Sequence, residues 1–72
     1  MAAQFKTALI ILRRKDVEAR TGLSRSTIYQ RIKEGTFPAP IPLGSKAVGW
    51  VESEIEGFLV GCIAQRDNNL KG

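Results

Sequence analysis

Histidine is absent from this sequence, and cysteine, tryptophan and tyrosine occur only once each. Without histidine, and with Cys62 alone, the chain cannot form an internal disulfide, a Cys/His zinc site or a Ser-His or Cys-His nucleophile pair. A chain of 72 residues also buries only a small core, which leaves little room for a deep catalytic pocket. These shortages argue against an enzyme, and they predict neither a metal ion nor a cofactor.

Apolar runs are short as well. Ala8–Leu12 is too short to cross a bilayer, and its positive charges, Arg13–Lys15, follow the run, whereas in a signal peptide they precede it. We interpret it as a short strand or an extended lead-in to one domain, which covers residues 1–72. Residues 1–7, which show no periodicity, and the polar residues 67–72 are predicted to be flexible tails of a cytoplasmic protein.

Positive charge is concentrated in the first part of the chain. Residues 1–50 carry 9 basic and 3 acidic side chains, a net charge of +6, whereas residues 51–72 carry 2 basic and 4 acidic side chains, a net charge of −2. This asymmetry is typical of a protein with one basic face for nucleic acid and a more neutral supporting part. Small basic proteins without a nucleic-acid partner exist, so charge alone does not establish the function.

The stretch GLSRSTIYQRIKEG predicts a short helix over residues 24–34. Ser24 is a favourable N-cap, and Gly35 is a favourable helix stop. Ile28 and Ile32 lie four residues apart, so they share one face of the helix and are expected to anchor it to the core. The remaining side chains would then face outward.

A second, two-turn helix over residues 15–21 is predicted before Gly22, whose conformational freedom permits a tight turn. Two short helices joined in this way form a helix-turn-helix candidate. The outer face of the second helix suits the DNA major groove, and an ordinary solvated helix is the alternative. The side chains of that face are Arg25, Ser26, Tyr29, Gln30 and Lys33.

Three prolines within residues 38–42 exclude a continuing helix. Alternating apolar residues on both sides of a Gly-Ser-Lys-Ala segment then predict a hairpin over residues 41–50, with Lys46 near its tip. Beside a helix-turn-helix, such a hairpin would be a wing that reaches a phosphate or the minor groove. The alternative is a plain loop that covers the core with Phe37 and Trp50. In either case Trp50 and Phe58 are predicted to be core residues, because a chain this small needs its few aromatic side chains inside.

The spacing of apolar residues predicts an amphipathic helix over residues 52–66. Ser53 and Glu56 resemble a capping box at its start, and Cys62 is predicted to be a buried core thiol. The glutamates at the start of this helix are expected to oppose the positive end of its dipole, since no histidine or metal partner supports catalysis. The apolar stripe consists of Ile55, Phe58, Leu59, Cys62 and Ile63.

The run from Leu12 through Trp50 closely resembles the AlpA family of prophage transcriptional regulators. The segments VEARTGLSRSTIYQRIKEGTFPAPIPLG and AVGWVESEI carry the resemblance, and they include the helix-turn-helix and the glycine-tryptophan pair. The family is related to phage excisionases and to the winged-helix domain of MerR-type regulators. The resemblance therefore implies a mainly α fold with a small β-hairpin, a winged helix-turn-helix, that binds DNA.

Carried across by position, the resemblance implies roles for individual residues. The recognition-helix positions are Arg25, Ser26, Thr27, Tyr29 and Gln30, and the wing position is Lys46. Further phosphate contacts could come from Arg13, Arg14, Arg20 and Lys33. The family often has a basic residue at the position of Gln30 and an apolar one at that of Arg31. These departures leave the base preference open, and Arg31 could point either at a phosphate or into the core.

The leading hypothesis is a sequence-specific double-stranded DNA-binding regulator of a phage or prophage. Such proteins control transcription, act as excision directionality factors, or do both. The expected partners are duplex DNA, an integrase or RNA polymerase, and a second copy of the chain on DNA, which would place the protein at the nucleoid. The alternative is a small adaptor without DNA specificity, which would bind another protein through Tyr29, Phe37 or the glycine face of the last helix.

Overall fold

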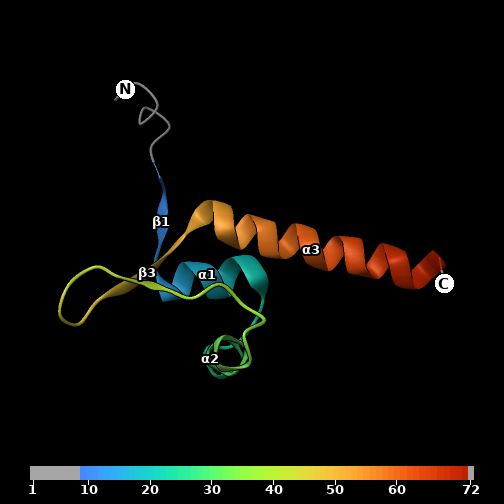
Figure 1. The fold of residues 1–72 in the computed structure, drawn as a ribbon. Coiled ribbons are helices and arrows are strands. Elements are labelled where there is room, and N and C mark those ends of the chain that lie inside the picture. Colours follow the sequence, from blue (N-terminus) through green and yellow to red (C-terminus); the bar gives the residue numbers. More distant parts are fainter. Residues whose placement is uncertain (1–8, 72) are drawn as a thin grey trace.

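A computed structural model describes residues 9–71, which form three short strands and three helices in the order β1-α1-α2-β2-β3-α3 (Figure 1). The strands are Ile11–Leu12 (β1), Ile41–Pro42 (β2) and Val48–Val51 (β3), and the helices are Arg14–Thr21 (α1), Arg25–Glu34 (α2) and Glu52–Lys71 (α3). This order confirms the predicted fold class, a mainly α winged helix-turn-helix with a small hairpin. The predicted flexible arm over residues 1–7 lies outside the described residues.

The first helix of the helix-turn-helix, α1, begins one residue earlier than predicted. The Asp16 carboxylate accepts a hydrogen bond from the Arg13 N–H at 3.1 Å, and this bond stabilises a start that lacks a Ser, Thr, Asp or Asn cap. The helix ends at Gly22, whose φ of 74° is left-handed and whose N–H donates to the Glu18 carbonyl at 2.8 Å. The turn predicted at this glycine is therefore confirmed.

The second helix, α2, begins and ends where its sequence predicts. The Ser24 hydroxyl accepts a hydrogen bond from the Thr27 N–H at 3.2 Å, and Gly35 ends the helix with a φ of 81°. Ile28 is fully buried, and Ile32 packs against the same core. The apolar line of α2 therefore faces inward, and its polar side chains remain outside.

The three strands form one small antiparallel sheet in which β3 lies between β1 and β2. This sheet confirms both the short N-terminal strand and the predicted hairpin, which we call the wing (residues 41–51). Pro42 lies on the edge strand, where its missing N–H interrupts no ladder. The Leu43 N–H donates to the Ala47 carbonyl at 2.7 Å and closes the loop that carries Lys46.

Gly49 allows β1 to lie close against β3. A Cβ atom at this position would lie 2.5 Å from Cγ2 of Ile11 and 3.0 Å from Cδ1 of Leu43, closer than side-chain atoms normally approach. Any larger residue would therefore push β1 or the wing loop away. Since β1 leads directly into α1, the close approach fixes the start of α1 relative to the wing.

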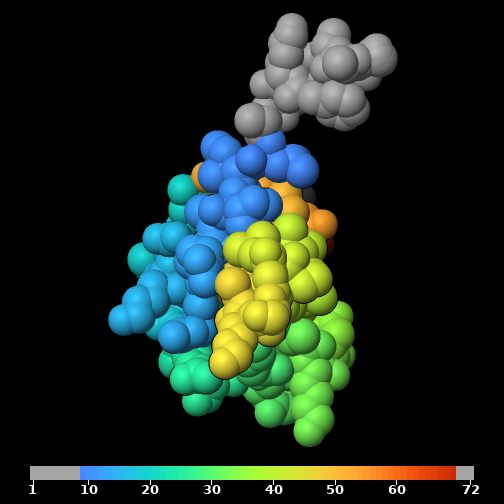
Figure 2. All heavy atoms as spheres, turned by 90° about the vertical axis from the view of Figure 1, so that its left-hand side faces the viewer, coloured from blue at the N-terminus to red at the C-terminus, as the bar shows by residue number. Residues whose placement is uncertain are grey.

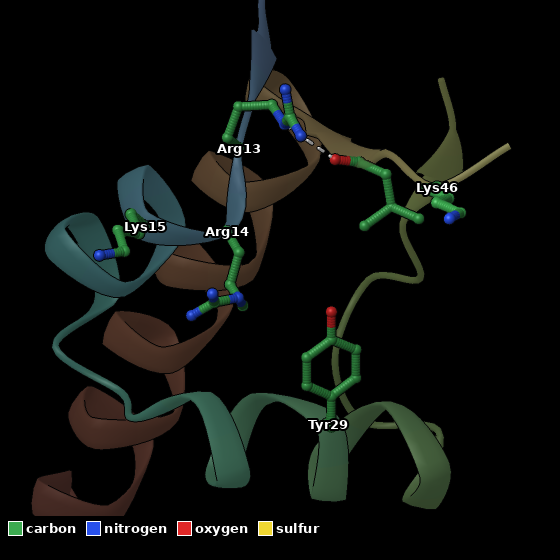
Figure 3. Close-up of a pocket in the computed structure, with 6 residues that line it drawn as sticks. Arg13, Arg14, Lys15, Tyr29 and Lys46 are labelled. Atoms are coloured by element: carbon green, nitrogen blue, oxygen red, sulfur yellow. Dashed lines mark hydrogen bonds between the residues drawn. The ribbon is translucent and has the colours of Figure 1, made fainter. Parts of the chain in front are cut away.

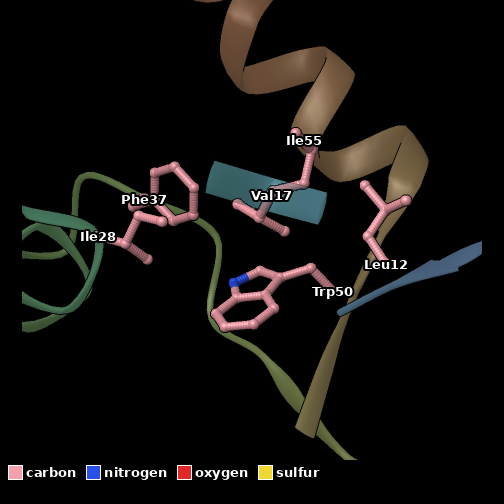
Figure 4. Packing of buried hydrophobic residues seen from close by; sticks show 6 residues of the cluster. All are labelled: Leu12, Val17, Ile28, Phe37, Trp50 and Ile55. Carbon is pink, nitrogen blue, oxygen red and sulfur yellow. The ribbon is translucent and has the colours of Figure 1, made fainter. Parts of the chain in front are cut away.

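The core combines residues from β1, β3 and all three helices with one residue of the loop after α2 (Figure 4). Trp50 is fully buried, as predicted, and its Nε1–H donates to the Pro38 carbonyl at 3.0 Å. The Phe37 ring packs edge-on against Phe58 of α3, with 4.7 Å between ring centres. Phe58 was also predicted to be a core residue, and it is half-buried against this cluster. The buried residues are Leu12, Val17, Ile28, Phe37, Trp50 and Ile55.

The last helix, α3, differs from its predicted boundaries. It starts at Glu52, so Ser53 lies within the first turn and is not the N-cap of a capping box. It also continues to residue 71, through the segment predicted to be a polar tail. Of the helices within residues 9–71, none combines the length and apolarity needed to span a membrane.

The apolar stripe of α3 is buried only at its beginning. Ile55 is fully buried and Leu59 packs against the core, but Ile63 is 50% exposed. Cys62 is exposed too, so the prediction of a buried core thiol is wrong. The physical reason is that the second half of α3 projects beyond the rest of the domain, where the described residues offer no surface to cover it (Figure 1).

We predict that Trp50→Ala lowers the free energy of unfolding by about 3–5 kcal/mol, because it empties the centre of the core and removes the donor to the Pro38 carbonyl. This loss approaches the whole stability of a small domain. Circular dichroism should therefore show no cooperative thermal transition. Val60→Ala removes a side chain that is 63% exposed and should melt like the wild type. A cooperatively melting W50A protein would contradict the central role of Trp50.

Candidate functional site

A basic groove of about 340 Å³ lies where the start of α1, the middle of α2 and the wing meet (Figure 3). Its lining carries four basic side chains and no acidic one. Figure 2 shows these three parts of the chain together on one face of the molecule, with α1 in blue, the wing in yellow and α2 in green. The residues of the basic groove are Arg13, Arg14, Lys15, Tyr29, Lys46 and Val48.

Arg13 connects two sides of the basic groove. It precedes α1, and its Nε–H donates to the Val48 carbonyl of the wing at 3.2 Å (Figure 3). This bond fixes the guanidinium group between α1 and the wing. A guanidinium group has five N–H donors, and within the described residues this side chain uses only the one on Nε. The donors of its two terminal nitrogens therefore remain available to a ligand.

Tyr29 projects from α2 into the basic groove (Figure 3). Its ring packs edge-on against Trp50, with 6.3 Å between ring centres and an interplanar angle of 65°. Because Trp50 is buried in the core, this contact holds the tyrosine ring in place while 39% of the residue stays exposed. The hydroxyl group lies at the far end of the ring, between the side chains of Arg14 and Lys46 in Figure 3.

The positive charge of the basic groove is only partly compensated. Arg14 forms an ion pair with Glu18, at 2.6 Å between Nη1 and Oε2. Lys15 and Lys46 form no ion pair within the described residues. Moreover, Arg14 and Lys15 lie in the first turn of α1, where the positive end of the helix dipole disfavours cations. An anion in the groove would relieve this repulsion, so the electrostatics are those of an anion-binding site.

The structure brings together four residues that sequence reasoning selected separately, namely Arg13, Arg14, Tyr29 and Lys46. It adds Lys15, which sequence reasoning assigned only to the start of a helix. The signal that could have identified Lys15 is its position directly after two arginines, in a run of three cations.

The other predicted recognition residues lie along α2. Gln30 donates from Nε2 to Oε2 of Glu34 at 2.9 Å, so part of its side chain is engaged within the helix. Thr27 is half-buried, and its hydroxyl accepts a hydrogen bond from the Ser24 hydroxyl at 3.0 Å. Thr27 therefore supports the start of α2. The predicted residues that are exposed along this helix, besides Tyr29, are Arg25, Ser26, Gln30 and Lys33.

Arg20 is a predicted phosphate contact, and Arg31 was expected to point either at a phosphate or into the core. Both lie outside the basic groove. Arg20 forms an ion pair with Glu52 at the start of α3, at 2.7 Å between Nη1 and Oε2, and so connects α1 to α3. Arg31 is half-buried, and its guanidinium carbon lies 6.0 Å from the centre of the Phe58 ring, a cation–π contact. Arg31 therefore packs against α3, and its phosphate contact stays a prediction.

A second hollow of about 590 Å³ lies between the end of α2 and α3. It is relevant to the adaptor hypothesis, because the glycine face of α3 opens into it. Phe37, another contact of that hypothesis, is 6% exposed and belongs to the core, so it is unavailable to a protein partner. The lining residues of the second hollow are Arg31, Thr36, Gly57, Phe58, Gly61, Cys62 and Gln65.

Comparisons with known proteins point to one family. A family model described as Prophage CP4-57 regulatory protein (AlpA) matches residues 10–63, which include the whole basic groove and α2. The chain is 40% identical over 60 residues to the DNA-binding transcriptional activator AlpA of Escherichia coli (strain K12), a match that covers 75% of this chain and 86% of that protein.

A protein of Enterobacteria phage P4, the uncharacterized protein ORF88, is more similar in sequence. It is 47% identical to this chain over 55 residues, which are 76% of this chain. The same match spans 62% of the P4 protein, so the chain covers less than two thirds of that relative's length.

We predict that Arg20 and Glu52 stabilise the fold through their ion pair, with a coupling energy of roughly 0.5 kcal/mol. A double-mutant cycle of Arg20→Ala and Glu52→Ala in urea denaturation measures it. Arg66 and Asp67, a more exposed ion pair of adjacent residues on α3, provide the control cycle, whose coupling should be close to zero. Equal coupling in the two cycles would show that Arg20 does not connect α1 to α3 energetically.

Proposed function

The chain belongs to the AlpA family of prophage regulatory proteins, and on this basis we propose that it binds double-stranded DNA and thereby regulates a phage or prophage. The observation that carries the proposal is the basic groove, which lies beside the exposed polar side of α2. A helix presents base-reading side chains to the DNA major groove, whereas clustered cations bind the phosphates that flank it. Both features occur here on adjoining elements.

In this proposal α2 reads the bases. Arg25 is the first residue of the helix and is exposed, and a recognition helix usually contacts base edges with its N-terminal part. Arginine can donate two hydrogen bonds to guanine, which no other exposed side chain of α2 can do with the same geometry. Ser26 and Gln30 would add contacts on the same helix, and Lys33 would reach a phosphate.

The wing and the start of α1 bind the backbone in this proposal. Lys46 lies in the loop of the wing, and a lysine ammonium is a point charge on a long stem that suits a phosphate better than a base edge. Arg13, Arg14 and Lys15 supply further cations on the other side of the basic groove. These contacts would position α2 without reading the sequence.

The position of the bound DNA distinguishes two regulatory outcomes. A site beside a promoter would control transcription through RNA polymerase, whereas a site in the attachment region would direct excision together with an integrase. A footprint over the intergenic and attachment-site DNA beside the gene tests both outcomes. Protection of neither region would contradict the proposed function.

We predict a steep dependence of duplex binding on salt. The basic groove offers four cations, and Lys33 on α2 brings the candidate phosphate contacts to five. If all five neutralise phosphates, the logarithm of the binding constant should fall with the logarithm of the salt concentration with a slope of about −5. Fluorescence anisotropy with a labelled duplex measures this slope. A flat dependence would favour the protein adaptor instead.

We also predict that Arg25 and Lys46 contribute in different ways. Arg25→Ala should weaken the cognate duplex by about 1–3 kcal/mol and barely change binding to a scrambled duplex, because it removes a base contact. Lys46→Ala should weaken both duplexes alike and reduce the salt slope by about one. Arg66→Ala, which removes the same charge from the far part of α3, is the control and should change neither. Equal weakening of both duplexes by R25A would make Arg25 a phosphate contact.

A further inference from the structure

The hydroxyl group of Tyr29 is a polar group without a partner in the described part of the chain. Trp50 holds the ring edge-on, and the oxygen lies in the basic groove, away from the backbone of α2 (Figure 3). A phenol hydroxyl can donate one hydrogen bond, and an anion beside it would be a strong acceptor. The position of the ring therefore places the Tyr29 hydroxyl group where it can donate a hydrogen bond to a ligand that enters the groove.

Cations approach the same space from two sides. Arg13 and Arg14 belong to the α1 side, and each is held by a second contact, to the Val48 carbonyl at 3.2 Å and to the Glu18 carboxylate at 2.6 Å. Lys46 comes from the wing on the other side. Side chains that other contacts already hold in one conformation lose less conformational entropy when they bind a ligand. The two arginines of the α1 side can therefore bind a small anion at a low entropic cost.

The basic groove is open to solvent and has room for a phosphate group with some of its water. Its volume of about 340 Å³ is roughly ten times the 30 Å³ that one water molecule occupies in the liquid. The lining also discriminates against an apolar group such as a thymine methyl, since four of its six residues are cations. Tyr29 is therefore better placed for a phosphate than for a base.

We propose that one backbone phosphate of duplex DNA enters the basic groove beside Tyr29, and that Tyr29 donates its hydroxyl hydrogen to an oxygen of this phosphate. The other cations of the groove would contact the phosphates next to it. This inference rests on the proposed function and refines it, because it removes Tyr29 from base reading although the residue lies on α2. This phosphate and its neighbours would be contacted from α1, α2 and the wing together, which would fix the wing and the recognition helix relative to one another on the DNA.

Tyr29→Phe tests the hydroxyl alone, because phenylalanine keeps the ring that packs on Trp50. We expect the variant to melt like the wild type and to bind DNA roughly 10-fold more weakly, the effect of one hydrogen bond to a charged group. The loss should be equal for the cognate and the scrambled duplex, since a phosphate carries no sequence. A loss confined to the cognate duplex would overturn the proposal and make Tyr29 a base-reading residue.

A scan of the duplex with single neutral methylphosphonate linkages locates the phosphate. At one position the neutral linkage should weaken DNA binding by the wild type but cause no further loss of affinity in Y29F, because both changes remove the same contact. At every other position the loss of binding free energy from the linkage and that from Y29F should add. Lys33→Ala is the matched control on the same helix. The binding free energy lost through this substitution should add to the loss caused by the linkage at the groove phosphate, because Lys33 lies outside the groove.

The result also separates this inference from the proposed function. If the wild type binds duplex DNA with a steep salt slope while Y29F binds as tightly, the phosphate site is wrong and the proposed function stands. Additive losses at every linkage would likewise overturn the phosphate site alone. If the wild type shows no salt-dependent duplex binding at all, the proposed function fails and the inference fails with it.

Discussion

The packing of Trp50 is the interaction on which the rest of the structure depends. Trp50 lies in the central strand, is fully buried, and donates its indole hydrogen to the Pro38 carbonyl, so it fixes the loop between α2 and the wing. Its ring also packs against Tyr29 in a T-shaped contact, which places a core residue directly beneath the basic groove. Within residues 9–71 there is no second buried cluster of comparable size to hold the wing against the helices. The core and the candidate site are therefore stabilised by the same side chain.

The elements of the fold could be predicted where their signals are local. Ser24 begins α2 and Gly35 ends it through contacts with their immediate neighbours, so the local sequence is enough to predict both ends of the helix. Burial along α3 was not predictable in this way, because it depends on where the rest of the domain ends. Cys62 continues the same apolar periodicity as Ile55, yet one is exposed and the other is buried. Periodicity identifies a helix face, but only the three-dimensional structure shows what covers that face.

The candidate site was predicted in its composition but not in its arrangement. Basic residues of the first fifty positions were recognised as a group, yet charge counts do not tell which of them form ion pairs within the protein. Arg20 and Arg31 turn to α3 through Glu52 and Phe58, whereas Lys15 joins the basic groove. These assignments follow from the way α1 and α2 pack beside α3, a tertiary property that no local pattern encodes.

We propose that the start of α1, α2 and the wing form one DNA-binding surface, and that the projecting part of α3 does not belong to it. Titration of the ¹⁵N-labelled protein with its footprinted duplex tests this claim most directly, because NMR reports each backbone amide separately. We predict large shift changes at the amides of Lys15, Tyr29 and Lys46 and almost none over residues 62–69. Changes concentrated in residues 62–69, with the basic groove unaffected, would contradict the account.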